Sequence, residues 1–228
     1  MSNQNHPVPS YNENLQTLVT QLNEMMPADK MAIFTNDALQ LATTHTSPLK
    51  ITAGDTAPTF SLPDQHKNTV NLSALLQQGP VVLTFYRGVW CPYCNLQLKN
   101  YQEILPQIHA AGASLVAISP MTPDNSLSTK EQNELQFSVL SDTGNHVARQ
   151  YTTVFKNSQA AVNAMSDLGY DFHSFYDDES GEIPVAATFV IDTDGTLLMA
   201  TSAGGDYRER VEPQDILDAL ATQKKSAQ

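Results

Sequence analysis

The stretch VVLTFYRGVWCPYCNLQLK, residues 81–99, holds the pattern on which the fold prediction rests. Its first six residues form a continuous apolar, partly β-branched run, which is typical of a central strand buried on both faces. Pro92 suits the first position of a helix, where its missing N–H costs nothing. Apolar residues then recur at helical spacing, at Leu98, Tyr101, Leu105 and Ile108, up to an expected helix end near Gly112. The stretch therefore predicts a buried strand that leads into a helix, with Cys91 and Cys94 at the junction.

Strands and helices alternate on both sides of this junction. Residues 54–72 predict a β-hairpin with its turn near 64–68, and Ser73 is expected to cap a short helix that ends at Gly79. Further strands are expected at 115–118, 137–140, 188–192 and 196–201, the last two joined by a turn at Asp194-Gly195. Further helices are expected after Thr122-Pro123, over 146–151 and over 213–221. This order predicts an α/β fold with a right-handed βαβ crossover.

The chain divides into a main domain with additions at both ends and in the middle. Residues 1–48 predict an N-terminal helical extension, with apolar residues at helical spacing from Leu15 to Met25. The extension is expected to pack on the main domain, residues 49–222, or on a second copy in a homodimer. Residues 152–184 fit an insertion that could act as a lid, and residues 223–228 are expected to form a flexible tail.

Charge and hydropathy argue against some classes of binding partner and indicate the cellular compartment. Lys and Arg number 12 and Asp and Glu number 24, so the formal net charge is −12. Such a surface repels phosphate backbones and anionic lipids, so neither nucleic acid nor a membrane is expected as a partner. The first fifteen residues lack the basic and apolar regions of a secretory signal, and no apolar run of 18 residues occurs. The cytoplasm is therefore the expected compartment.

The chain has two cysteines, three positions apart. A disulfide over so short a step closes almost no loop, so it would stabilise the fold very little. A zinc site would need further ligands, but there is no second CxxC and the six histidines show no paired ligand spacing. We therefore expect redox chemistry at Cys91 and Cys94, with neither a metal nor a cofactor.

The start of a helix favours a thiolate. The helix dipole contributes about 0.3–1 kcal/mol, which corresponds to less than about one pKa unit. A neighbouring cation must add to this effect, and Arg87, four residues before Cys91, is the nearest candidate. Residues three apart on the first turn can also bring their sulfurs together, so a sulfenic acid on one cysteine could condense with the other.

The residues around the two sulfurs are expected to form the binding surface. Trp90 stands directly before the first cysteine, and Pro92 and Tyr93 lie between the two. These three residues are the predicted substrate-binding positions. Asp171, His173 and residues 177–179 of the insertion could also line the site, although a solvated loop is the simpler interpretation.

The junction resembles the active-site strand and helix of the thioredoxin superfamily, and most closely the peroxiredoxin-like alkyl hydroperoxide reductase/thiol-specific antioxidant family. The same resemblance is carried by GDTAPTFSLPDQHKNTVNLSALL at 54–76, LVAISPMTPDNS at 115–126, VLSDTGN at 139–145 and TFVIDTDG at 188–195. It covers roughly residues 52–222 in unbroken order. The resemblance implies a thioredoxin-like fold, a central mixed sheet flanked by helices, and thiol-based reduction of peroxides or disulfides.

The family register assigns different roles to the two sulfurs. Peroxiredoxins carry Pro, three residues, Thr or Ser, two residues and the peroxidatic Cys, and this pattern places the peroxidatic position on Cys94. The Thr then falls on Cys91, the Pro on Arg87, and the Arg of the later strand on Ala186. In the register of thioredoxin, by contrast, Cys91 is the nucleophile and Cys94 the buried resolving thiol. The helix-terminus argument also favours Cys91, so both assignments stay open.

The resemblance implies a thiol-dependent peroxidase with a role in antioxidant defence. It would reduce hydrogen peroxide or organic hydroperoxides through a Cys91–Cys94 disulfide, which thioredoxin, glutaredoxin or glutathione would then reduce. The first alternative is a thioredoxin-like thiol–disulfide oxidoreductase. The second is a redox-sensing module that uses the insertion as its interface.

Overall fold

The computed structural model describes residues 7–226, with side chains up to residue 222. Its centre is a five-stranded mixed sheet in the order β5-β4-β3-β8-β9. The strands are β3 (Val81–Phe85), β4 (Ser114–Ser119), β5 (Ser138–Ser141), β8 (Ala187–Ile191) and β9 (Leu197–Thr201). β3 is parallel to β4 and antiparallel to β8, and β4 is parallel to β5. The expected α/β class with a central mixed sheet is therefore confirmed.

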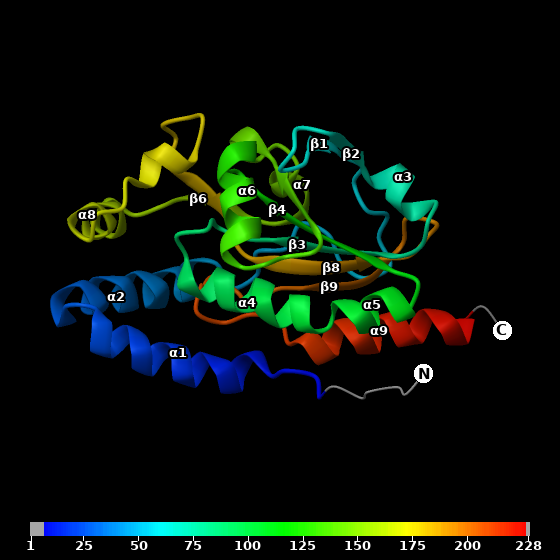
Figure 1. Cartoon of the computed structure of the whole chain (residues 1–228), viewed down its shortest axis with the longest axis horizontal. Helices are drawn as coiled ribbons and strands as arrows, with labels where there is room; N and C mark the ends of the chain where they lie inside the picture. Colours follow the sequence, from blue (N-terminus) through cyan, green and yellow to red (C-terminus); the bar gives the residue numbers. More distant parts are fainter. Residues whose placement is uncertain (1–6, 227–228) are drawn as a thin grey trace.

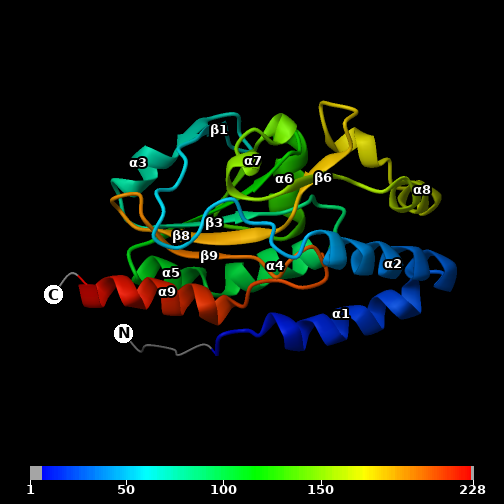
Figure 2. The same cartoon turned by 180° about the vertical axis from the view of Figure 1, so that it is seen from behind.

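The apolar run at 81–85 occupies the middle of the sheet, and its side chains alternate between two cores. Val82 packs into the cluster under α4 (Pro92–Glu103), α5 (Leu105–Ala110) and α9 (Pro213–Ser226). Leu83 and Phe85 pack into the opposite cluster, together with α3 (Leu72–Leu76) and α7 (Ala148–Tyr151). Figures 1 and 2 show the first group of helices on one face of the sheet and the second on the other. Helices on both faces explain why the strand reads as continuously apolar.

The remaining elements of the main domain lie at its periphery. The hairpin of β1 (Ser61–Pro63) and β2 (Thr69–Asn71) turns at 64–68, as the sequence predicts. Helix α6 (Pro123–Gln132) contacts β5, and the Thr122 hydroxyl caps it by accepting a hydrogen bond from the Asn125 N–H. A short 3₁₀ turn, η1 (Thr143–Asn145), precedes α7.

Several helix boundaries differ from the sequence-based expectation, among them the end of α3 at Leu76 instead of Gly79 and the start of α7 at Ala148 instead of residue 146. The expected helix from Pro92 to Gly112 is two helices, with a break at Ile104, because Pro106 has no N–H to continue the first helix. Helix α3 begins at Leu72 with Asn71 as its N-cap, so Ser73 lies inside the helix and does not cap it. Helix α9 runs on to Ser226, past the expected end at residue 221 and into the expected tail, whose last two residues lie outside the described chain.

The N-terminal extension consists of two helices, α1 (Tyr11–Met25) and α2 (Ala28–Thr44). They pack on the main domain of the same chain, α1 against α4 and α2 against the insertion (Figure 2). Glu212 fixes the start of α1, because its carboxylate accepts hydrogen bonds from the backbone N–H groups of Tyr11 and Asn12 at 2.8 and 3.0 Å. A carboxylate at a helix N-terminus also interacts favourably with the helix dipole.

The insertion forms an arm beside α2. It contains β6 (Val154–Lys156), α8 (Gln159–Asp167), a 3₁₀ helix η2 (Phe172–Phe175) and β7 (Glu182–Pro184), and β6 pairs antiparallel with β7. An ion pair between Lys30 of α2 and Asp167 of α8 joins the arm to the extension. Within residues 7–226, no helix combines the length and apolar character that a membrane crossing requires.

Candidate active site

The two cysteines lie at the start of α4, where β3 gives way to the helix. Cys91 is the N-cap residue with extended backbone angles (φ −90°, ψ 110°), and Pro92 occupies the first helical turn. Cys94 follows within the same turn. Both thiols are free, and their side chains are buried, at 1% and 0% exposure. The local pattern therefore placed the pair correctly, because Pro92 starts a helix directly after a buried strand.

Cys94 is surrounded by hydrogen-bond donors and positive charge. Arg210 donates from Nη2 to Cys94 Sγ at 3.2 Å. Burial alone would raise the pKa of Cys94, but a hydrogen bond from Cys91, the charges of Arg210 and Arg87, and a backbone hydrogen bond from Arg87 together hold it well below its usual range. These interactions favour the thiolate form of Cys94.

Cys91 has the opposite character. Burial raises the pKa of its thiol, and donation of its S–H to Cys94 and the negative charge of Cys94 raise it further. The positive charges of Arg87 and Arg210 only partly offset this effect. The two thiols titrate as a coupled pair, in which the hydrogen bond from Arg210 favours the negative charge on Cys94.

Arg210 is the residue that sequence reasoning missed. It lies in the segment between β9 and α9 and is 6% exposed. Its guanidinium is held by Gln97 Oε1 at 3.0 Å and by the backbone carbonyls of Tyr207 and Glu209. Residue 210 is 116 positions from Cys94, so no local spacing links the two. At the position where the family pattern has its Arg stands Ala186, which carries no charge.

Arg87 is buried at 3% exposure and lies beside the same pair. Its guanidinium carbon stands 3.9 Å from the ring centre of Tyr207 and 4.8 Å from that of Trp90. Its Nη2 donates a hydrogen bond of 3.4 Å to Asn157 Oδ1. Stacking on two aromatic rings fixes the charge near the thiols at little solvation cost, which a Lys ammonium would not do equally well.

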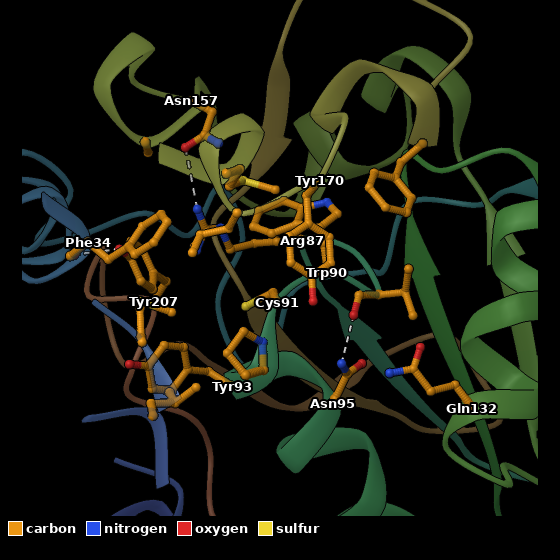
Figure 3. A pocket seen from close by; sticks show the side chains of 18 of the residues that line it. Phe34, Arg87, Trp90, Cys91, Tyr93, Asn95, Gln132, Asn157, Tyr170 and Tyr207 are labelled. Atoms are coloured by element: carbon orange, nitrogen blue, oxygen red, sulfur yellow. Dashed lines mark hydrogen bonds between the residues drawn. The ribbon is translucent and has the colours of Figure 1, made fainter. Parts of the chain in front are cut away.

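A cavity of about 500 Å³ opens in front of Cys91 (Figure 3). Arg87, Trp90, Pro92 and Tyr93 line it together with Cys91, so the predicted binding residues share one cavity. Cys94 is not among the lining residues and is fully buried. Most of the remaining lining is apolar and comes from the extension and the insertion: Leu22, Met26, Met31, Phe34, Ala161, Met165, Leu168, Tyr170 and Phe175.

The insertion is attached to the active-site loop through Tyr176. The Tyr176 hydroxyl accepts a hydrogen bond from Trp90 Nε1 at 2.8 Å and donates one to the Arg87 carbonyl at 3.0 Å. Phe172 packs edge-on against Trp90, with ring centres 5.4 Å apart. The acidic and histidine side chains named from the sequence are not among the lining residues. Asp171 instead caps η2 by accepting a hydrogen bond from the His173 N–H.

Residues 7–226 contain no cluster of three or more His, Cys, Asp or Glu side chains that could hold a metal ion. The chemistry that the site can support is that of the thiol pair itself. A thiolate with a bound arginine is a nucleophile, and a thiol in hydrogen-bond contact with it can donate a proton and then close a disulfide.

The chain is similar to several known proteins. The model of the AhpC/TSA family matches residues 53–199. Peroxiredoxin Q, chloroplastic, of Sedum lineare is 27% identical over 169 residues, which cover 74% of this chain and 75% of that protein. Peroxiredoxin Bcp of Escherichia coli is 35% identical over 105 residues, or 46% of this chain and 65% of that protein. The crystal structure of peroxidoxin BcpB from Mycobacterium tuberculosis matches with a TM-score of 0.59 and 26% identity, covering 75% of this chain and 97% of that one.

Proposed function

The chain belongs to the AhpC/TSA family and is a thiol-dependent peroxidase, an oxidoreductase of the peroxiredoxin type, and we propose that Cys94 and Cys91 carry its catalytic cycle. The observation that carries this proposal is the buried Cys94 thiolate, bonded by Arg210 and in contact with the Cys91 thiol. A thiolate, not a thiol, attacks the peroxide bond, so Cys94 is the peroxidatic residue and Cys91 the resolving one.

The oxidative half of the cycle balances with these two groups. The Cys94 thiolate attacks the terminal peroxide oxygen, the O–O bond breaks, and the products are Cys94 sulfenic acid and an alkoxide. The alkoxide takes the proton of Cys91 and leaves as the alcohol. The Cys91 thiolate then attacks the Cys94 sulfur and expels hydroxide, which becomes water with a proton from solvent. Two electrons pass from the dithiol to the peroxide.

The reductive half follows from which sulfur faces the cavity. A reducing thiol can reach Cys91 Sγ, which lines the cavity, and its attack releases Cys94 as the leaving thiolate. A leaving thiol with a low pKa departs faster, and Arg210 supplies that stabilisation to Cys94. The reductant is a thiol of the thioredoxin type, and we infer that thioredoxin, glutaredoxin or glutathione donates the electrons. Because the dithiol must be reduced again after each turnover, a reducing compartment such as the cytoplasm suits it.

Single-cysteine variants test the assignment. With hydrogen peroxide and a sulfenic-acid trap, Cys91→Ser should accumulate the trapped adduct, because Cys94 is oxidised and cannot be resolved. Cys94→Ser should give no adduct at a comparable rate, since burial, the largest cause of the raised pKa of the Cys91 thiol, remains in this variant. Adduct formation only in Cys94→Ser would reverse the two roles. Oxidation of both variants at the rate of free cysteine would exclude an efficient peroxidase.

One observation favours a second function, that of a thiol–disulfide oxidoreductase. Cys91 is the sulfur that faces the cavity and stands at the N-cap, which is the arrangement of an attacking cysteine with a buried resolving partner. Reduction of insulin disulfides by the dithiol protein, together with slow oxidation by peroxide, would select this function.

A further inference from the structure

The cavity in front of Cys91 has walls that come from outside the sheet domain. One wall is the α1–α2 hairpin, which contributes Met26, Met31 and Phe34 and precedes the region matched by the family model. A second apolar wall is α8 and the residue that follows it, Leu168, while α6 adds a polar side with Asn125, Ser128 and Gln132. The Lys30–Asp167 ion pair connects the two walls. The α1–α2 hairpin and α8 therefore supply the apolar part of the lining in front of Cys91.

The inner end of the cavity has a different character. Arg87 and Asn157 both line it and are 3% and 4% exposed. Arg87 Nε and Asn157 Nδ2 have no hydrogen-bond partner among the described residues. A buried donor without a partner is costly, and two of them side by side are an expected binding point for the acceptor oxygen of a ligand. Figure 3 shows the hydrogen bond that joins the Asn157 and Arg87 side chains, with Cys91 below Arg87 in the view.

We propose that the α1–α2 hairpin and α8 form a specificity element that selects hydroperoxides bearing a bulky apolar group, with Arg87 and Asn157 binding the peroxide oxygens. The proposal rests on the peroxidase function given above. The apolar group of the substrate lies among Met26, Met31, Phe34 and Leu168, while the O–O bond lies beside Arg87 and Cys91 and reaches Cys94 when the Cys91 side chain moves aside. Methionine side chains suit this role because they adapt to apolar groups of different shape.

The size of the space supports selection of a large substrate. A volume of about 500 Å³ lies within the range of about 300–1,000 Å³ found for sites that enclose small organic molecules. Hydrogen peroxide is only slightly larger than water, whose share of the liquid is about 30 Å³, and it has no apolar surface to bury. The apolar walls can therefore stabilise only a hydroperoxide that carries an organic group.

Binding can be measured without turnover. Trp90 is the one tryptophan of the chain and lines the cavity. The probe is cumyl alcohol, the product of cumene hydroperoxide, which retains the bulky group and one oxygen but cannot oxidise the thiols. Titration of the reduced protein should give a saturable change in Trp90 emission.

The matched variants are Met31→Gln and Leu168→Gln, on opposite walls, and Met25→Gln as the control. Met25 is 82% exposed and does not line the cavity, whereas Met31 and Leu168 are only partly exposed and do. Each cavity variant should weaken cumyl alcohol binding and lower the ratio of kcat/KM for cumene hydroperoxide to that for hydrogen peroxide by about tenfold. Met25→Gln should keep the wild-type values. Circular dichroism checks that each variant is folded. If one cavity variant does not fold, the other still tests the proposal.

The outcomes separate this inference from the peroxidase function. A wild-type protein that reduces peroxides but shows no saturable response to cumyl alcohol, or a kcat/KM ratio that is equal in all four proteins, overturns the specificity element and leaves the peroxidase intact. Saturable binding that the cavity variants weaken, in a protein that turns over no peroxide, supports the cavity and refutes the peroxidase.

Discussion

Replacement of Arg210 by Gln tests the electrostatic basis of the site. Arg210 donates to Cys94 Sγ at 3.2 Å, and both side chains are buried, so solvent and salt screen the contact little. A hydrogen bond to a charged group contributes about 1.5–3 kcal/mol. One pKa unit corresponds to about 1.36 kcal/mol, so the pKa of Cys94 should rise by about one to two units. The charge of Arg87 and the hydrogen bond from residue 91 still favour the Cys94 thiolate, and this limits the rise in the pKa of Cys94.

The assay is the pH dependence of alkylation by iodoacetamide in a Cys91→Ser background, where Cys94 is the sole thiol. Because the folded pKa of Cys94 is depressed, its thiolate is present above that pKa and is lost as the pH falls through it. The midpoint of the Arg210→Gln profile should therefore move to higher pH by about one to two units, so that alkylation slows at neutral pH and recovers under alkaline conditions.

Two further variants make the result decisive. Arg208→Gln removes a neighbouring arginine that pairs with Asp206 and hydrogen-bonds neither cysteine, so its profile should match the parent. Arg210→Lys keeps the charge but loses the fixed fork of donors, and its midpoint should lie between those of the parent and Arg210→Gln. A midpoint for Arg210→Gln that coincides with that of Arg208→Gln would refute the assignment of the thiolate to this contact.

Two remaining predictions concern how the additions are held to the main domain. Tyr176→Phe removes the hydrogen bonds to Trp90 Nε1 and the Arg87 carbonyl, so Trp90 emission should shift and the free energy of unfolding in urea should fall by about 1–3 kcal/mol; unchanged values would show that the insertion is held by ring packing alone. Gly205→Ala places a Cβ 2.0 Å from the Leu41 carbonyl oxygen of α2, so overpacking should lower the free energy of unfolding by about 1–3 kcal/mol, and an unaltered urea midpoint would contradict this close approach.

The parts of the fold that were predictable have local signals. A few neighbouring residues predict the local structure at three places: the strand at 81–85, the turn at 64–68 and the helix start at Thr122-Pro123. The break at Ile104 has a local signal too, in Pro106, but the apolar spacing up to Ile108 continues across it and conceals it. Hydrophobic periodicity indicates which residues face the core. Two consecutive helices that bury the same face can therefore give one continuous pattern.

Only the part of the site that is built from neighbouring residues was predictable. Cys91, Cys94 and Arg87 lie within eight residues, and one strand–helix junction places them all. Arg210 lies in the segment between β9 and α9, 116 positions from its partner Cys94. Asn157 lies in the insertion, 70 positions from its partner Arg87. Neither residue belongs to a motif, so only the folded chain shows that the charge absent at Ala186 is supplied from another element.

In the proposed catalytic cycle, the Arg210–Cys94 contact affects both the oxidative and the reductive half. A thiolate that is stabilised too strongly is a poorer nucleophile, because nucleophilicity falls as the thiol pKa falls. The same stabilisation makes Cys94 a better leaving group when the disulfide is reduced at Cys91. Arg210 therefore assists the release of Cys94 directly, while its effect on the peroxide step depends on how much thiolate it adds at the working pH. Loss of Arg210 should accordingly slow disulfide reduction even under alkaline conditions where Cys94 is fully ionised, and the peroxide step should not slow there.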